Sequence, residues 1–276
     1  MIGMSIYSRL QVLVAAFILL LGGACSGGED EILTYQSMEV AITAGDFSSI
    51  KEGMTRTVDE GYHTSFKDGD EVGIFVIDNT TQKVKQSNLR YKYSASTLIW
   101  QSIDTEVAYY ENAYYLVYYP YMGGIDESVV KGTKNYSENA DAIYSVFVRD
   151  RYDFNQGTQA AYSSKDLMIG KADVSKGNDG LPRVIARIEH RLALILVNMR
   201  QRVSSGGTKA VKPGMKIGYD VYGWMTPDSV YRLLIKPLEN IRVEMGYPSW
   251  DFAHSSVETV NIAPGKYVCY NITIPE

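Results

Sequence analysis

The stretch VAYYENAYYLVYYPYMGG, Val107 to Gly124, places seven tyrosines in a run that holds no histidine and no cysteine. Successive side chains of an extended strand point to opposite faces. One face then carries Tyr114, Leu116 and Tyr118, and the other carries Tyr115, Val117 and Tyr119. Both faces are aromatic or apolar, which is typical of a central strand covered on both sides. A strand whose outer face meets another protein or a sugar has the same pattern, so both interpretations stay open.

The overall composition favours a globular, sheet-rich protein. The chain has 276 residues, 45% of them hydrophobic and 21% charged, which is enough apolar material for sizeable cores. Its 22 tyrosines far outnumber its 7 phenylalanines, and aromatic enrichment of this kind favours strands. The net charge of -5 and the absence of a Lys/Arg cluster exclude a nucleic-acid-binding surface. We therefore expect protein or carbohydrate partners.

The N-terminus has the features of an export signal. Arg9 precedes the apolar run VLVAAFILLL, which ends at Leu21 and is followed by the small residues GGAC. The run is shorter than the 18 to 20 apolar residues, roughly, that span a bilayer. We predict a signal peptide over residues 1–24.

Cys25 is the candidate for a lipid anchor. Small residues before a cysteine resemble the lipobox of bacterial lipoproteins, in which the cysteine is acylated, although Gly22 stands where that pattern usually has leucine. The polar stretch SGGEDE that follows resembles the acidic export signal of surface lipoproteins in Bacteroidetes. Residues 25–33 are then a lipidated tether, and the protein is held at the outer membrane on the cell surface. A cleaved signal peptide without lipid is the alternative.

The rest of the chain predicts an all-β fold. Short alternating runs recur between Gly, Pro, Asn, Asp and Ser, as expected for β-sandwiches: EVGIFVID, LRYKYS, KIGYDVYG, VYRLLIKP, NIRVEM and KYVCYNITI. The polar, glycine-rich link GKADVSKGNDGLPR ends at Arg183 and suggests a domain boundary. We predict an N-terminal domain over residues 34–182 and a C-terminal domain over residues 183–276. One long strand from Val184 to Leu196 would open the second domain.

The sequence offers no catalytic or metal-binding constellation. His63, His190 and His254 lie in separate segments, without cysteine or carboxylate ligands at metal-site spacing. We interpret His190 as a core histidine with a backbone partner. The protein is therefore not expected to be an enzyme or to hold a cofactor or metal.

Several segments taken together resemble the fimbrillin family, the pilin and pilin-accessory lipoproteins of Bacteroidetes. The resemblance covers nearly the whole chain and rests on the lipoprotein start, the dipeptide TR at residues 55–56, FKDGDEVGIFV, YYPY, DLMIGKADVSKG, IEHRLALILV, VYRLLIKPLENIRVEM and APGKYVCYNITI. It implies two tandem transthyretin-like β-sandwich domains. It also implies that the tyrosine run is mainly core, with Tyr119 and Tyr121 the more exposed members.

The resemblance further implies assembly by strand exchange with other fimbrial subunits. The subunit's own first strand, TYQSMEVAITA, would fill a groove through one apolar face, Met38, Val40 and Ile42. A trypsin-like maturation protease would then remove that strand by cutting at a basic residue, for which Arg56 is the best candidate and Lys51 a poorer one. An exposed loop arginine without such a role is the alternative.

The incoming strand would be the C-terminal strand of a neighbouring subunit. In KYVCYNITIPE, one apolar face carries Val268, Tyr270, Ile272 and Ile274. The same segment could equally be the last strand of its own domain. The predicted function is a structural or accessory subunit of adhesive fimbriae. A surface lipoprotein that binds a host or nutrient glycan through exposed tyrosines is the alternative.

Overall fold

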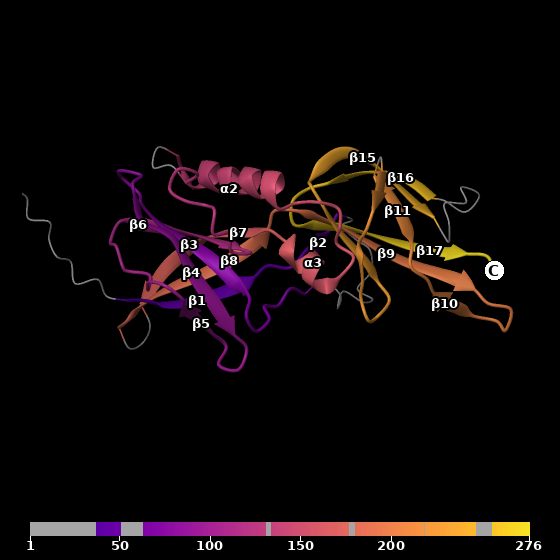
Figure 1. Cartoon of the computed structure of the whole chain (residues 1–276), viewed down its shortest axis with the longest axis horizontal. Coiled ribbons are helices and arrows are strands. Elements are labelled where there is room, and N and C mark those ends of the chain that lie inside the picture. The colour runs from indigo at the N-terminus through magenta and orange to yellow at the C-terminus, as the bar shows by residue number, and fades with distance from the viewer. Residues whose placement is uncertain (1–36, 51–62, 131–133, 177–179, 218, 247–255) are drawn as a thin grey trace, which may run out of the picture. The chain divides into compact units, whose positions relative to one another are not determined.

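The computed structural model describes residues 37–50, 63–130, 134–176, 180–217, 219–246 and 256–276. Strands dominate these residues, which confirms the prediction of an all-β fold (Figure 1). The described helices are α2 (Tyr136–Asp150) and α3 (Gln159–Ser164). Neither of them is long and apolar enough to cross a membrane.

The N-terminal half forms one seven-stranded sheet. Its order is β1-β8-β7-β6-β3-β4-β5, so β6 is the central strand and β1 and β5 are the edges. The strands are β1 (Glu39–Ala44), β3 (Glu71–Asp78), β4 (Val84–Ser94), β5 (Ile99–Ser102), β6 (Ala113–Tyr119), β7 (Met168–Lys176) and β8 (Pro182–His190). The run of tyrosines therefore includes the central strand of a sheet, which was one of the two interpretations of its pattern and the one that the family resemblance implied.

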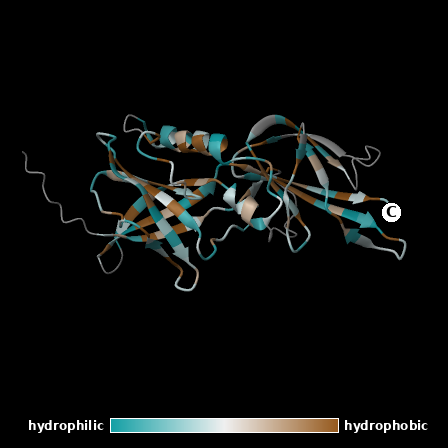
Figure 2. Cartoon of the chain, in the orientation of Figure 1, coloured by the Kyte–Doolittle hydropathy of each residue, from teal (hydrophilic) through white to brown (hydrophobic). Residues whose placement is uncertain are grey.

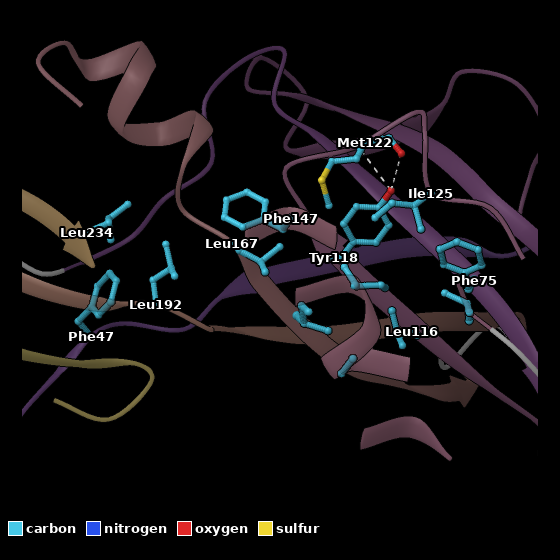
Figure 3. Close-up of a cluster of buried hydrophobic side chains, with 14 of the residues drawn as sticks. Phe47, Phe75, Leu116, Tyr118, Met122, Ile125, Phe147, Leu167, Leu192 and Leu234 are labelled. Carbon is cyan, nitrogen blue, oxygen red and sulfur yellow. Dashed lines mark hydrogen bonds between the residues drawn. The ribbon is translucent and has the colours of Figure 1, made fainter. Parts of the chain in front are cut away.

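Both faces of β6 are buried, each in a different hydrophobic cluster. Tyr114, Leu116 and Tyr118 enter the helix-side cluster, which we define as the buried residues that include Phe147 of α2 and Tyr162 of α3 and that continue to Leu194 of the C-terminal half. Figure 3 shows part of this cluster, with the hydroxyl of Tyr118 turned toward Met122. That hydroxyl donates to the carbonyl of Met122 at 3.1 Å and accepts from its N–H at 3.2 Å. A buried tyrosine keeps its polar tip satisfied in this way.

The opposite face of the sheet encloses what we call the inner cluster, to which Tyr115, Val117 and Tyr119 of β6 belong. The sheet curves until its edges approach each other. The indole N–H of Trp100 in β5 donates to the carbonyl of Ile42 in β1 at 3.3 Å. Just before β1, the N–H of Met38 donates to the carbonyl of Val107 at 3.1 Å. One curved sheet thus surrounds this cluster.

The C-terminal half is built from two facing sheets. The six-stranded sheet has the order β13-β14-β9-β17-β2, with β10 also paired to β9, and the four-stranded sheet has the order β12-β11-β15-β16. Their strands are β2 (Ser48–Ser49), β9 (Ala193–Arg202), β10 (Thr208–Ala210), β11 (Gly214–Ile217), β12 (Tyr219–Val221), β13 (Trp224–Met225), β14 (Tyr231–Ile235), β15 (Leu238–Gly246), β16 (Ser256–Ile262) and β17 (Lys266–Ile274). Apolar side chains from both sheets form the sandwich cluster between them, for example Ile195, Val243 and Val268. Hydrophobic residues lie interleaved with hydrophilic ones along these strands (Figure 2).

The run 184–196, predicted as one long strand, is divided between two sheets. Its first part is β8 of the seven-stranded sheet, and its second part is β9 of the six-stranded sheet. The chain changes sheets at Arg191 and Leu192. The predicted boundary at residue 183 therefore falls inside the seven-stranded sheet, at the start of β8.

Helix α2 was not predicted. Its buried residues are Asn139, Ala140, Ile143 and Phe147, a short face at helical spacing. The side chain of Asn135 accepts from the backbone of Glu138, whose carboxylate accepts from the N–H of Asn135 in return. This capping box was visible in the sequence NYSE and could have indicated the helix start.

Candidate functional site

Strand β1, the predicted removable strand, lies at the edge of the seven-stranded sheet. It pairs in parallel with β8, from Glu39 opposite Arg183 to Ala44 opposite Ile188. Within this sheet, β1 has a hydrogen-bonded neighbouring strand, β8, on one edge only. An edge strand of this kind can leave without dividing the sheet that remains.

The predicted apolar face of β1 is buried in the inner cluster. Met38, Val40 and Ile42 are 5%, 4% and 6% exposed, whereas the alternate residues Ala41 and Thr43 are exposed. Burial of three such side chains contributes about 1.5 to 3 kcal/mol each before ordering costs. On β8, Val184 lies opposite Val40, Ala186 opposite Ile42 and Ile188 opposite Ala44, and all three β8 residues are buried in the same cluster. Without β1 these groups would line an apolar groove.

The chain after β1 crosses to the six-stranded sheet. Phe47 is buried in the helix-side cluster, where Figure 3 shows it close to Leu192. Strand β2 then pairs in parallel with the start of β17, where Ser48 N donates to Gly265 O at 3.0 Å. Ile50 packs against the sandwich cluster. Residues 37–50 therefore contribute to all three clusters, which the sequence pattern of β1 alone did not indicate.

His190 fixes this crossing. Its ring stacks on Phe47 with centroids 3.6 Å apart. Its Nδ1 lies 2.6 Å from Oδ1 of Asp166, and its Nε2 lies 3.0 Å from Oγ1 of Thr64. The prediction of a core histidine holds, but its partners are side chains and not the backbone. A hydroxyl, an imidazole and a carboxylate also form hydrolase triads. Here the His190 side chain is fully covered.

The predicted protease site, Arg56, its alternative Lys51 and the predicted lipidation site Cys25 lie outside the described residues. The described residues on either side of 51–62 meet at Asp46. Its carboxylate accepts from the backbone N–H of Thr64 at 2.8 Å and lies within 3.2 Å of His63 Nδ1. The described chain before residues 51–62 is thus joined to the described chain after them through Asp46.

The predicted donor strand lies within its own six-stranded sheet. It is β17, which pairs in parallel with β9 from Tyr267 to Ile274. Val268 and Ile274 are each 5% exposed, and Tyr270 and Ile272 pack partly buried against the sandwich cluster. On its other side β17 meets only the two residues of β2 within the described sheet.

Two predictions about exposed tyrosines need correction. Tyr119 is 8% exposed, because it faces the inner cluster and its hydroxyl donates to Asp70 at 3.3 Å. Tyr121 is half-buried, beneath the guanidinium of Arg90. The described tyrosines that are most exposed are Tyr109 and Tyr222, at 36% and 56%.

In the described ranges, no group of three or more His, Cys, Asp or Glu side chains is arranged to hold a metal ion.

The chain is similar to fimbrial proteins of Bacteroides. A family model described as fimbrillin-like matches residues 55–222. Over 194 residues the chain is 25% identical to a protein of Bacteroides ovatus provisionally assigned as fimbrium tip subunit Fim1C. The match covers 70% of this chain and 35% of that protein, so the chain spans about a third of that relative.

Two crystal structures share the fold. A fimbrial protein from Bacteroides ovatus has a TM-score of 0.63 at 17% identity, over 88% of this chain and 50% of that chain. A provisionally assigned cell adhesion protein from Bacteroides uniformis has a TM-score of 0.52 at 13% identity, over 88% of this chain and 94% of that chain.

Proposed function

Because the chain belongs to the fimbrillin-like family, we propose that it is a subunit of a cell-surface fimbria and joins other fimbrial subunits by strand exchange. The observation that carries this proposal is the position of β1. An edge strand with three buried apolar side chains fills a groove that an extended segment from another subunit could fill equally well.

Loss of β1 would leave two unsatisfied features side by side. The backbone N–H and C=O groups of β8 that face β1 would lose their partners, and the apolar side chains of the groove would meet water. Such an edge either aggregates or binds another strand. A donor strand with apolar residues at every second position would repair both features. Its backbone would pair with β8, and its alternate side chains would fill the apolar groove.

Proteolysis would make the exchange possible. While β1 is covalently attached, its local concentration is high and an incoming strand competes poorly. A cut at Arg56 by a trypsin-like protease would turn residues 37–50 into part of a separate fragment. The contacts of Asp46 with His63 and Thr64 join the described chain before the cut to the described chain after it. The released fragment would have to break them, together with the hydrogen bond from Ile50 N to Tyr267 O.

The donor that we propose is β17 of a neighbouring subunit. Its face of Val268, Tyr270, Ile272 and Ile274 has the same period of two as Met38, Val40 and Ile42. Four such side chains contribute on the order of 6 to 12 kcal/mol gross before ordering costs. The fragment that fills the groove also carries β2, which covers the start of β17. Its departure would thus uncover an acceptor groove and the edge of β17 at Lys266 and Tyr267, while β17 stays paired with β9. A subunit whose β17 stays in its own sheet would instead be a terminal or accessory one.

Anchoring at the outer membrane through an acyl chain on Cys25 is the remaining part of the proposal. Wild-type cells are expected to carry the chain in the surface membrane or fibre fraction, labelled by a radioactive fatty acid. Cys25→Ala should release it into the medium or periplasm, because the residue that receives the acyl chain is gone. Cell fractionation and metabolic labelling measure both effects. An unlabelled wild-type chain would refute the anchor, and a chain found only inside the cell would refute the fimbrial role.

A further inference from the structure

A cavity of about 240 Å³ opens beside the point where the chain crosses between the sheets. Its walls come from the residues just before β3, the end of β6, helix α3 and strands β9, β13 and β14. Phe47, on the segment after β1, closes one side. Pockets for drug-sized ligands are larger, roughly 300 to 1,000 Å³. The cavity is therefore of a size for a single small ring.

The charged groups in the wall are balanced in sign. They are Lys67, Asp70, Asp166 and Arg232, together with His63 at the rim, which is paired with Asp46. Two carboxylates therefore face two permanent cations. Neither an anion nor a cation would be favoured by the net charge of this lining, whereas a neutral ligand with many hydroxyl groups can donate to the carboxylates and accept from the cations.

Asp70 is the most distinctive polar group of the cavity. The backbone N–H of Lys67 donates to its Oδ2 at 2.7 Å, and Tyr119 donates to its Oδ1 at 3.3 Å. No lysine or arginine of the described chain lies within ion-pair distance of this carboxylate. Burial raises the pKa of Asp70, because the cost of desolvating the carboxylate exceeds the opposing effects of its two hydrogen bonds and of the charge of Lys67. Each carboxylate oxygen can accept a second hydrogen bond, for which a ligand hydroxyl is suited.

Aromatic rings supply the apolar part of the wall. Phe66 and Tyr119 meet edge to face at 5.6 Å, and Trp224 lies 5.6 Å from Tyr162. Trp224 is half-buried, with the guanidinium of Arg232 at 5.8 Å from its ring. The C–H groups of a sugar ring form an apolar face that packs on such rings, while its hydroxyls point to the polar side chains around them.

From the size, charge balance and aromatic walls together, we infer that this cavity binds one neutral saccharide residue. Asp70 accepts hydrogen bonds from its hydroxyls, and Trp224 packs on its ring. The site is distinct from the exposed tyrosines considered in the sequence. Phe47 lines one side of it and would leave with residues 37–50 on strand exchange, so the site belongs to the uncut chain. The uncut chain would attach to a glycan through a residue inserted at the junction of its sheets.

The test is binding of methyl glycosides of glucose, galactose, mannose and N-acetylglucosamine to the purified chain, by saturation-transfer NMR and calorimetry. At least one is expected to bind, and more tightly than the anion methyl glucuronide or the cation lysine methyl ester. Asp70→Asn keeps the side-chain shape and should weaken binding by about tenfold or more, as should Trp224→Ala. Circular dichroism should show that both variants are folded. If Trp224→Ala does not fold, the glycoside affinity of Asp70→Asn alone tests the inference.

Tyr109→Ala is the matched control, because Tyr109 lines a separate cavity of about 330 Å³. It should leave glycoside binding unchanged. The inference is overturned if none of the four glycosides binds, if a charged probe binds more tightly than all of them, or if Asp70→Asn binds like the wild type. Loss of binding in Tyr109→Ala alone would move the site to the other cavity and overturn it as well.

Discussion

Treatment of the purified chain with a trypsin-like protease is expected to convert monomers into oligomers that survive mild denaturant. The cut at Arg56 would allow residues 37–50 to leave, and their loss exposes apolar surface that belonged to all three clusters. A neighbouring strand can cover that surface and pair with β8. Size-exclusion chromatography with light scattering, in the presence of low urea, measures the conversion.

Arg56→Ala is the control for this conversion. The variant lacks the basic residue at which the protease is expected to cut, so it should stay monomeric under the same treatment while its circular dichroism spectrum matches the wild type. Lys51→Ala should still convert if Arg56 is the site. A cut chain that stays monomeric with β1 and β17 intact would rule out strand exchange and favour the glycan-binding function.

Val40→Asp is expected to lower the free energy of unfolding by about 3 to 5 kcal/mol, because it places an unpaired carboxylate among the buried side chains of the inner cluster. Val40 is 4% exposed and lies opposite Val184. The matched control is Ala41→Asp on the next residue, whose side chain faces solvent. Its effect should stay within about 1 kcal/mol.

Urea unfolding followed by circular dichroism gives both values from the same extrapolation. Equal losses in the two variants would mean that β1 is not held by one buried face. The proposed role of β1 as a strand that fills a groove would then lose its physical basis.

The two-faced pattern of β6 predicted a strand that is apolar on both faces, and it left a buried central strand and a strand with an exposed binding face as alternatives. Tyr114, Leu116 and Tyr118 enter one cluster and the alternate residues enter the other, because a period of two fixes which side chains share a face whatever the neighbouring strands are. The same logic placed Met38, Val40 and Ile42 on one face, and the family resemblance implied that this face is buried, as it is.

The break at Arg191 and Leu192 could not be predicted from that pattern. Apart from His190, apolar residues continue across it at every second position, so the run resembles one long strand. The bend is held by long-range hydrogen bonds: Arg191 N donates to Leu167 O at 2.8 Å, and Gly265 N donates to Leu192 O at 2.9 Å. Such partners are distant in sequence, and local alternation carries no information about them.

The surroundings of His190 were missed for the same reason. Phe47, Thr64 and Asp166 come from three separate segments, and no motif joins them. The isolated aromatic in AGDFSS was the one available signal, since an apolar ring between small and polar residues often marks an anchor in a core. Only the fold shows that the segment after β1 reaches a second sheet.

The most direct test of strand exchange is to tether β1 to β8 and ask whether assembly stops. Ala41 and Ile185 are opposite each other in the parallel register, and both are exposed. The double variant Ala41→Cys and Ile185→Cys, in a Cys25→Ala background, can form a disulfide across the two strands. After protease treatment, the oxidised variant is expected to stay monomeric and to form oligomers once a reductant opens the disulfide, while the single variant Ala41→Cys assembles in both conditions. Equal assembly of the double variant with the disulfide intact would contradict the claim that β1 leaves its groove.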